Sequence, residues 1–319
     1  MQPHVPQCPW CKTEESAFLC SVPSIDGHAY RLLRCSECKT VFFDFQNGYS
    51  TKTETVYTDE YYGTSSTKFH PAIERILDYF RGSRAREVAD LVPPSSRILD
   101  VGCGNGGFLN CLAKIGFSEL YGVELPGKAA ERSEKIKAIR LYVGDVLSAD
   151  FPANSFDVIT LFHVFEHLEQ PQQTLRYLVN RLKPGGYLIL TLPNIDSFQF
   201  QLFGWHWLHL DPPRHRFFIT PQTLKAQMLA LGLSCVSERY GDLEQNPFGF
   251  IQSFLNAMSF KRDALFERFK GNKNYAGPMK FGAMVQLMLA LGVVPLAVIL
   301  NGVEGILHKG ATMKWVFRK

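Results

Sequence analysis

A glycine-rich turn that directly follows a short apolar run constrains the fold more than any other feature of the chain. Residues 98–107 read Ile-Leu-Asp-Val-Gly-Cys-Gly-Asn-Gly-Gly. Glycines such as Gly102, Gly104 and Gly106 are needed where the backbone turns tightly and lies against a ligand without an intervening Cβ. A strand, a glycine turn and a helix in this order predict a Rossmann-like βαβ unit that holds a cofactor on the turn.

Apolar runs alternate with helical stretches after this turn. The runs are Ile98–Val101, Leu120–Val123, Ile139–Val143, Val158–Phe162 and Tyr187–Leu192. This alternation predicts an α/β fold with a mostly parallel sheet. With 319 residues, of which 46% are hydrophobic, the chain can form one good-sized α/β domain and small appendages. Residues 71–91 should form an amphipathic helix before the sheet.

The glycine turn alone leaves two cofactor classes open. Gly102, Gly104 and Gly107 also satisfy the dinucleotide-binding pattern, so a nicotinamide dehydrogenase is an alternative. Asp100, however, stands two residues before the first glycine. A carboxylate there would repel a pyrophosphate but attract the sulfonium and ammonium groups of S-adenosylmethionine (SAM). Asp100 therefore favours SAM.

Acidic residues also end the next two apolar runs. Glu124 follows the second run and can accept hydrogen bonds from both ribose hydroxyls. Asp145, which is followed by Val146, ends the third run and can accept from the adenine amino group. These residues predict the ribose and adenine ends of the cofactor site.

Further motifs follow the glycine turn, and together with it they make residues 95–240 resemble the class I SAM-dependent methyltransferases. The resemblance is to the branch similar to ubiquinone-biosynthesis O-methyltransferases and bacterial sugar or lipid methyltransferases. The motifs are Asp157-Val158-Ile159, His163 to Leu168, Leu182-Lys183-Pro184-Gly185-Gly186 and Leu192-Pro193-Asn194. The resemblance implies a Rossmann-like class I sheet and methyl transfer from SAM. It implies SAM contacts at Asp100, Gly102, Gly104, Gly106, Glu124, Asp145, Val146 and His163. A SAM-fold subunit without activity is the alternative.

Methyl transfer to a hydroxyl or acidic carbon also needs a base with a near-neutral pKa. His163, Glu166 and His167 follow the fourth apolar run, at the sheet edge where ligands bind. In a helical start these three residues share one face. We expect His163 to line the pocket and consider His167 a candidate base. Alternatively, Glu166 and His167 form a buried pair that only holds the loop.

A second candidate base lies in the segment Asp211 to Arg216. His215 belongs to an Asp-x-Pro-x-His pattern that, by the resemblance, faces the active site, and we favour it over His167 as the base. Aromatic residues precede the segment: Phe198, Phe200, Phe203, Trp205 and Trp207. They predict a cover that excludes water from the reaction, or else a loop packed on the sheet edge.

Two Cys-x-x-Cys pairs at the N-terminus predict a zinc ribbon over residues 1–45. Cys8, Cys11, Cys35 and Cys38 form a four-thiolate set, with 23 residues between the pairs. Four protein ligands leave no open position, so the zinc would be structural. A ribbon also raises the alternative of an RNA methyltransferase. Its basic and acidic residues balance, however, so we expect no nucleic-acid partner.

The segment 281–300 contains no charged residue and is long enough to span a bilayer. The preceding residues 261–280 carry a net charge of +4, equal to that of the whole chain. An apolar segment beside a basic one predicts contact with an anionic membrane surface. Because a strand should follow, a hairpin in one leaflet fits better than a single crossing. A dimer interface or a helical cap is the alternative.

Together these features predict a three-part enzyme that lies in the cytoplasm and binds the membrane peripherally or monotopically. The acceptor would be a small-molecule or lipid-linked hydroxyl or an activated carbon, related to glycans, lipids or isoprenoids. The parts are a zinc ribbon, a methyltransferase domain and a membrane-seeking helical insertion. In sequence they correspond to five segments: the zinc ribbon (1–45), a linker and helix (46–94), the SAM-binding core (95–246), the hydrophobic helical insertion (247–311) and the last core strand (312–319).

Overall fold

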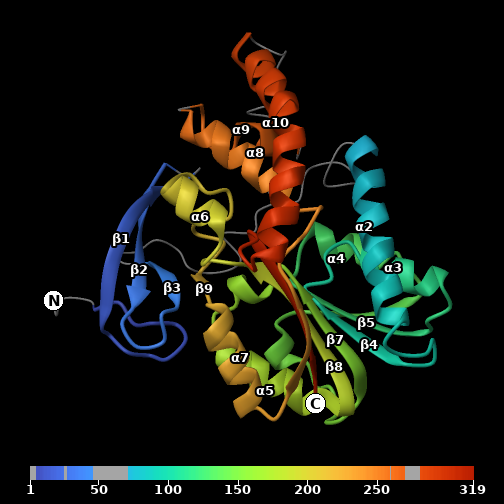
Figure 1. Cartoon of the computed structure of the whole chain (residues 1–319). Coiled ribbons are helices and arrows are strands. Elements are labelled where there is room, and N and C mark those ends of the chain that lie inside the picture. Colours follow the sequence, from blue (N-terminus) through green and yellow to red (C-terminus); the bar gives the residue numbers. More distant parts are fainter. Residues whose placement is uncertain (1–4, 25–26, 46–70, 259, 270–280) are drawn as a thin grey trace.

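The computed structural model describes residues 5–24, 27–45, 71–258, 260–269 and 281–319. It has a large sheet flanked by helices, a small sheet at one side and a helical unit that projects from the top in the view of Figure 1. The predicted linker falls largely in 46–70, outside the described residues, as does the part of the basic stretch in 270–280.

The large sheet has seven strands in the order β10-β11-β8-β7-β4-β5-β6. Strands β8, β7, β4, β5 and β6 are parallel, whereas β11 runs antiparallel to both of its neighbours. Their bounds are β4 Arg97–Val101, β5 Glu119–Glu124, β6 Ile139–Val143, β7 Phe156–Phe162, β8 Leu182–Pro193, β10 Ser234–Arg239 and β11 Thr312–Arg318. The predicted α/β class and its mostly parallel sheet are confirmed.

Helices cover both faces of this sheet. Successive residues of a strand point to opposite faces, so neighbouring residues pack against different helices. Ile98 packs in the cluster formed with α2 (Pro71–Ala89) and α3 (Gly107–Lys114). Its neighbour Leu99 packs in the cluster that contains residues of α5 (Pro171–Arg181) and α7 (Pro221–Ala230). The strands are therefore apolar on both sides, as the continuous runs in the sequence indicated. Short α4 (Lys128–Ser133) precedes β6.

The N-terminal module is a small antiparallel sheet whose last strand comes from the core. Its order is β1-β2-β3-β9. The bounds are β1 Ser16–Pro23, β2 Ala29–Cys35, β3 Val41–Asp44 and β9 Phe217–Phe218. Strands β2 and β3 enclose the second cysteine pair, since β2 ends at Cys35 and β3 begins at Val41. Because β9 lies just after the Asp211 to Arg216 segment, the module holds that segment against the core.

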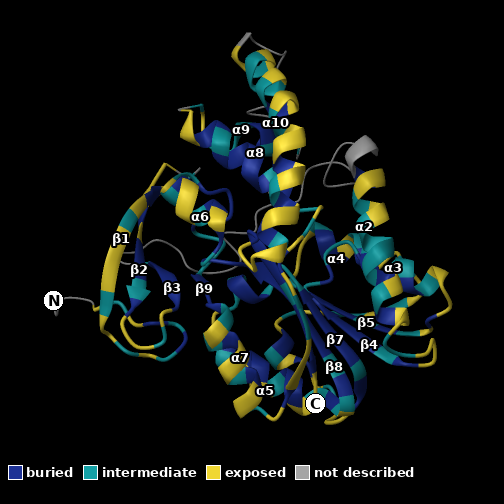
Figure 2. Cartoon of the chain, viewed as in Figure 1, coloured by how far each residue is buried: buried dark blue, intermediate teal, exposed yellow. Residues whose placement is uncertain are grey.

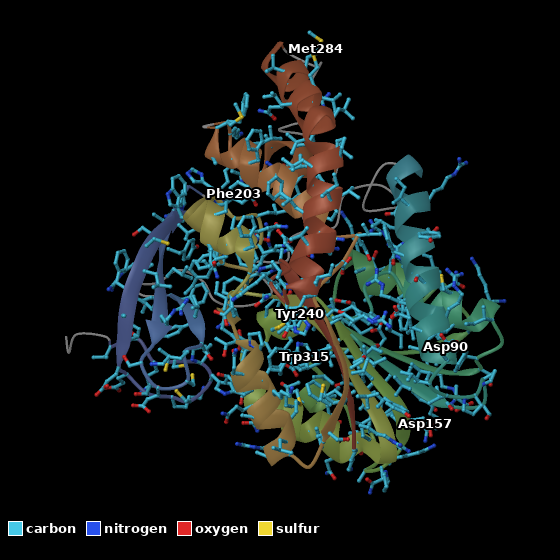
Figure 3. The ribbon with its side chains drawn as sticks, in the orientation of Figure 1. Asp90, Asp157, Phe203, Tyr240, Met284 and Trp315 are labelled. Carbon is cyan, nitrogen blue, oxygen red and sulfur yellow. The ribbon has the colours of Figure 1, made fainter. Side chains whose placement is uncertain are left out.

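In its described residues, the predicted insertion before the last strand contains three helices: α8 Asn246–Ala257, α9 Ala264–Phe269 and α10 Phe281–Ile306. The chain then returns to the large sheet as β11, between β8 and β10. Figure 3 places Tyr240 and Trp315 where the base of α10 meets the sheet and Met284 near its far end. Figure 2 shows much of α10 exposed, whereas the central strands are buried.

Candidate active site

The three glycines of the turn have different tasks. Gly102, Gly104 and Gly106 all have positive φ angles, of 70°, 57° and 75°. A Cβ on Gly102 would collide with Val164, and a Cβ on Gly106 would lie 2.8 Å from Ile139 Cδ1. A Cβ on Gly104 would meet no atom within 4 Å. Gly102 and Gly106 are thus needed for close packing, whereas Gly104 borders open space that a ligand can occupy.

That open space is a cavity of about 380 Å³. Besides the glycine turn, its wall includes residues of α2, α8 and α9, the segment 208–215, and Ser24, which directly follows β1 of the small sheet. Among the predicted SAM contacts, Asp100, Gly102, Gly104 and His163 line it. The cavity therefore joins the cofactor turn to both appendages. The lining does not include Gly106, Glu124, Asp145 or Val146.

Asp100 is a buried carboxyl group at the end of β4. It is 3% exposed and accepts a hydrogen bond of 2.7 Å from Thr160 Oγ1. Burial raises the pKa of Asp100 to about 7, although the Thr160 hydrogen bond and the charge of Arg84 act in the opposite direction. A cation that binds beside such a buried carboxyl group stabilises its ionised form.

Glu124 is the last residue of β5, as predicted, and Asp145 lies two residues beyond the end of β6. Glu124 accepts from the backbone N–H of Gly104 at 2.6 Å and from that of Leu125 at 3.0 Å. The exposed Asp145 side chain accepts from Leu147 N at 2.7 Å, while Val146 is buried. Their roles at the ribose and adenine remain predictions, and Glu124 also fixes the glycine turn.

The structure brings the two predicted histidine clusters together around Glu166. This carboxylate is 1% exposed. His163 Nδ1 lies 3.6 Å and His215 Nε2 lies 4.0 Å from Glu166 Oε1. The rings of His167 and His215 are 4.8 Å apart between centroids. Residues about fifty positions apart in sequence thus form one charged cluster in the cavity wall.

Burial and mutual charge set the protonation of this cluster. Burial alone would lower the pKa of His163, but the hydrogen bond and charge of Glu166 outweigh it and raise that pKa. Burial and the neighbouring His215 lower the pKa of His167 to about 4. For Glu166, burial acts to raise the pKa, but the three histidines hold it at about 2. The cluster thus combines an anionic carboxylate with one basic and one neutral imidazole.

The aromatic residues of 198–207 do not form the predicted cover over the cavity. Trp207 and Phe203 are buried in a second core between the small sheet and α8. Phe203 packs edge-on against Phe250, and Trp207 lies 6.0 Å from the ring of Phe218. The packed-loop alternative therefore holds for these rings, because the small sheet offers them an apolar partner. Residues 208–215, just after them, line the cavity instead.

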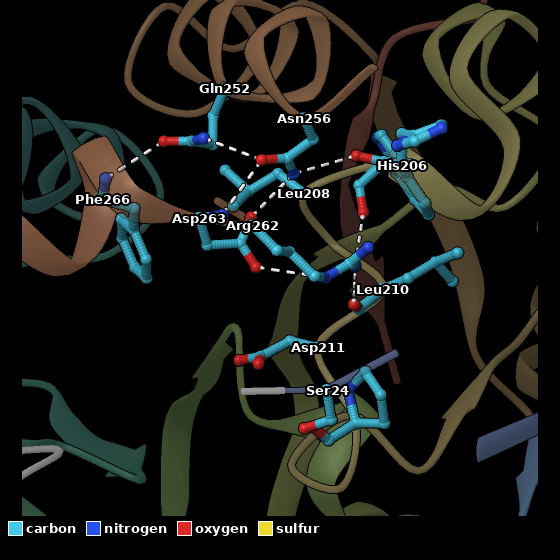
Figure 4. Close-up of polar contacts among 12 residues, drawn as sticks. Ser24, His206, Leu208, Leu210, Asp211, Gln252, Asn256, Arg262, Asp263 and Phe266 are labelled. Carbon is cyan, nitrogen blue, oxygen red and sulfur yellow. Dashed lines mark hydrogen bonds and ion pairs between the residues drawn. The ribbon is translucent and has the colours of Figure 1, made fainter. Parts of the chain in front are cut away.

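Arg262 ties the helical insertion to this cavity wall (Figure 4). Its guanidinium donates to the carbonyl oxygens of Trp205 and Leu210, both at 2.7 Å. Asn256 of α8 donates to the carbonyl of His206 at 3.1 Å and to Asp263 at 2.8 Å. The insertion thus fixes the backbone that leads to His215.

Sequence reasoning missed several residues of the wall. Leu77, Arg81 and Arg84 of α2 line the cavity, as does Ser24, which donates to the carbonyl of Pro212 at 2.7 Å. The spacing of four and three residues on α2 places its three side chains on one helical face. That spacing was the available signal, but charged residues on a helix usually indicate a solvated face.

The four N-terminal cysteines lie together as a metal site requires. Their sulfur atoms are all within 4.8 Å of one another, with Cys8 3.6 Å from Cys38 and Cys11 3.4 Å from Cys35. The Cys8 hydrogen bond lowers the pKa of Cys38 to about 4. Four thiols at these separations fit a tetrahedral zinc site after small adjustments.

A family model described as "Methyltransferase domain" matches residues 73–238. The mitochondrial ubiquinone biosynthesis O-methyltransferase of Candida albicans is 33% identical over 129 residues, which cover 37% of this chain and 39% of that protein. The ubiquinone biosynthesis O-methyltransferase of Bordetella avium is 28% identical over 171 residues, covering 49% and 69%. The 2-methyl-6-phytyl-1,4-hydroquinone methyltransferase of Synechocystis is 27% identical over 122 residues, covering 37% and 38%. The chain thus spans about two fifths of the first and third of these relatives.

Solved structures of similar arrangement include a SAM-dependent methyltransferase from Archaeoglobus fulgidus, at 18% identity and a TM-score of 0.48, covering 76% of this chain and 94% of that one. Another is phosphoethanolamine N-methyltransferase 2 of Haemonchus contortus with bound SAM, at 17% identity and a TM-score of 0.48, covering 74% and 52%. The family match extends over more than half of the chain and includes the glycine turn and the first five strands of the large sheet. The chain belongs to the methyltransferase-domain family.

Proposed function

We propose that this enzyme methylates a hydroxyl or an activated carbon of a lipid-linked, glycan-related or isoprenoid-related acceptor at a membrane surface. The observation that carries the proposal is that one cavity runs from the SAM turn to the base of an apolar, exposed helical unit. Phe248 of α8 and Phe266 of α9 line the same cavity as Gly104. An acceptor with an apolar part could thus reach the methyl group from the side of the insertion.

Helix α10 supports the membrane part of the proposal. Ala297, Asn301 and Glu304 are buried, and α10 packs against α8. Met288, Leu291 and Ile299 are each more than 60% exposed. The helix is long and apolar enough to cross a bilayer, and only 11% of its most apolar stretch is buried. An apolar surface of this kind needs a partner.

We favour lipid over a second subunit as that partner because cations accompany the apolar helix. Lys261 precedes α9 and Arg268 lies in its last turn, whereas Arg262 is bound in the cavity wall. The other basic residues of the predicted stretch lie outside the described residues. Anionic headgroups could pair with these cations while acyl chains cover α10. Because β11 returns to the sheet, α10 would lie in one leaflet instead of crossing once.

The relatives support an acceptor of the quinol type or a chemically related one. Two are named for ubiquinone biosynthesis and one for 2-methyl-6-phytyl-1,4-hydroquinone. An acceptor with an apolar chain and a ring hydroxyl would suit a cavity of this size next to an apolar helix.

We propose that the histidine cluster takes the acceptor proton. His163 and His215 both line the cavity, and both face Glu166. His163 lies immediately after β7, next to the glycine turn that positions SAM. In-line alignment of the nucleophile with the methyl group would supply most of the acceleration. At the other end, Asp100 would face the methionine part of SAM, with Glu124 and Asp145 toward ribose and adenine.

The zinc ribbon would have a structural role. Cys8, Cys11, Cys35 and Cys38 would hold one zinc ion and so stabilise a module with a small core. Through β9 and Ser24 this module would keep the His215 segment in place.

A transfer assay with labelled methyl-SAM tests the proposal. The protein would be incubated with membrane lipid extract, with soluble metabolite extract and with RNA, and each product fraction counted. We expect label in the organic phase of the lipid reaction. Label in RNA, or only in water-soluble products, would contradict the proposed acceptor class. No transfer to any fraction while SAM binds would favour the non-catalytic alternative.

A further inference from the structure

Glu304 is a carboxyl group with an incomplete set of hydrogen bonds at the base of α10, the end of the helix that meets the sheet. The residue is 2% exposed. Its Oε2 accepts from Gln199 Nε2 at 3.1 Å, whereas its Oε1 has no hydrogen-bond partner in the described residues. No lysine, arginine or histidine in the part of the chain that the structure describes pairs with it. An ionised carboxylate is costly in such a place.

Gln199 of α6 (Phe198–Phe203) has the complementary gap. It is 1% exposed, and its Nε2 donates both to Glu304 and to the carbonyl oxygen of Asn246, the latter at 3.0 Å. These bonds use both N–H groups of the amide, while the amide oxygen, Oε1, has no donor among the described residues. A neutral carboxylic acid can accept from an amide N–H and donate its O–H to the amide oxygen at the same time. A single proton on Glu304 would therefore satisfy both unpaired oxygens.

The same amide oxygen lies beside the wall of the cavity. A Cβ on Gly249 of α8 would lie 3.4 Å from Gln199 Oε1 and 3.2 Å from His209 Nε2, so these two atoms share the space that a side chain would otherwise fill. His209 lines the cavity, and its carbonyl oxygen accepts from His215 Nδ1 at 2.6 Å. Gln199 thus stands between the apolar helix and the segment that carries His215.

We propose that Glu304 carries a proton while the base of α10 is seated on the core, and that loss of this proton releases the base from Gln199. The proton passes to water, and the carboxylate that remains repels the lone pairs of Gln199 Oε1. Water must then solvate the charge, but the base is closely packed, since a Cβ on Gly305 would lie 3.2 Å from the backbone of Gly241. The base can admit water only by moving away from the core, which also frees the amide beside the cavity wall. Glu304 thus forms a pH-sensitive connection between α10 and the cavity.

Burial determines the pH at which this connection titrates. It raises the pKa of Glu304 to about 7, while the Gln199 hydrogen bond acts in the opposite direction. Neither α6 nor α8 contains an ionisable side chain. The ionisable groups of the other adjoining segments are not among the causes of this shift; in the described residues they are Asp196, His209, Tyr240, Asp242, Glu267, Arg268, His308 and Lys309. The neutral and the ionised forms of Glu304 are thus both populated near neutral pH.

This connection would respond to the membrane, a role that rests on the proposed function. An anionic bilayer with a surface potential of about −30 mV lowers the pH at its surface by about 0.5 units. Contact with lipid therefore favours the protonated form of Glu304 and the seated helix. On the membrane α10 stays joined to the cavity wall, whereas in mildly alkaline solution its base is released.

Hydrogen–deuterium exchange of segment 296–308 in the lipid-free, full-length protein tests the proposal, with the intrinsic exchange rate corrected at each pH. The pKa of Glu304 is about 7 when the base is seated, against 4.5 in water, so protection of this segment in wild type should fall about tenfold from pH 6 to pH 8. Glu304→Gln keeps both hydrogen bonds with Gln199 but cannot ionise, so its protection should stay constant. Glu134→Gln is the matched control, since that exposed carboxyl group at the end of α4 lies outside the connection, and it should keep the wild-type fall.

Two results would overturn the proposal: constant protection in wild type, or an equal fall in wild type and Glu304→Gln. If Glu304→Gln no longer binds SAM and is thus misfolded, Glu304→Met, which also cannot ionise, serves as the second variant with the same constant protection expected. Exchange without lipid is independent of the acceptor. A fall confined to wild type, without methylation of any lipid, would sink the proposed acceptor and leave the connection standing. Lipid methylation with equal exchange profiles in wild type and variant would do the reverse.

Discussion

Asp100 makes the cofactor assignment measurable, because its carboxyl group titrates near neutral pH. Burial raises its pKa to about 7, from 3.8. Only the ionised form of Asp100 attracts the sulfonium and ammonium groups of SAM. The apparent affinity of the protein for SAM is therefore proportional to the ionised fraction of Asp100. That fraction is about one tenth at pH 6 and about nine tenths at pH 8. SAM should therefore bind about tenfold more tightly at pH 8, with most of the change around pH 7.

Calorimetric titrations of wild type and Asp100→Asn at several pH values form the assay. Asparagine keeps the shape and can still pair with Thr160, but it cannot ionise. Other groups that titrate in this range, such as the amino group of SAM, affect both proteins. The ratio of wild-type to variant affinity cancels them. This ratio should rise about tenfold from pH 6 to pH 8. A flat ratio would refute the placement of Asp100 beside the SAM cation.

Stability without SAM gives an independent readout with the same sign logic. Because the folded pKa of Asp100 lies above the unfolded value, its contribution to stability is greatest at low pH and is lost as pH rises toward about 7. Asp100→Asn should therefore gain in melting temperature relative to wild type between about pH 4 and pH 7. A variant that melts lower at every pH would show that the carboxylate has a structural role instead.

Three further perturbations address the other parts of the molecule. Glu124→Ala and Gly104→Val should each abolish measurable SAM binding while the far-ultraviolet circular dichroism spectrum stays native. Glu124→Ala removes the hydrogen-bond acceptor for the ribose, and Gly104→Val fills the open space beside the turn. Unchanged SAM affinity in either variant would contradict the cofactor site. Metal analysis should find one tightly held zinc ion per chain, and the double variant Cys35→Ser and Cys38→Ser should lack it. A metal-free protein with a folded N-terminal module would exclude the zinc ribbon. Liposome flotation should require anionic lipid and weaken with salt, and Met288→Glu with Leu291→Glu should abolish it, whereas Lys225→Glu on the distant α7 should not. Flotation that persists in the α10 variant would remove that helix as the membrane contact.

The core of the fold was predictable because its signals are local. Apolar runs, glycine turns and acidic strand ends lie at short spacing, and the βαβ pattern then leaves few topologies. The return of β11 was also predictable, since an apolar segment at the chain end needs a sheet partner. Strand β1 escaped prediction because its apolar residues, Ala17 to Cys20, are consecutive and largely exposed, so they lack the alternation typical of a half-buried strand.

The wall of the cavity was less predictable because it depends on long-range contacts. Glu166 and His215 are adjacent only because β9 adds to the small sheet and Arg262 fixes the preceding carbonyls. No local pattern signals such a meeting. The aromatic stretch was misassigned for the same reason, since its buried rings, Phe203 and Trp207, pack in a core shared with a sheet of distant sequence. Composition indicated burial of these rings but not their partner.

The proposed membrane contact would position the cavity because the insertion is joined firmly to the core. Asn246, which is fully buried, accepts from the backbone and hydroxyl of Thr312 at 3.0 and 2.7 Å and donates to Asn301 of α10 and to the carbonyl of Tyr240. One amide thus links the last strand, the end of β10 and the apolar helix. Arg262 adds a second link to the cavity wall. With two such links, docking of α10 on lipid would orient the whole catalytic unit, whereas a flexible tether would only raise its local concentration. Substitution of Asn246 should therefore impair methylation of membrane-bound acceptors more than flotation itself.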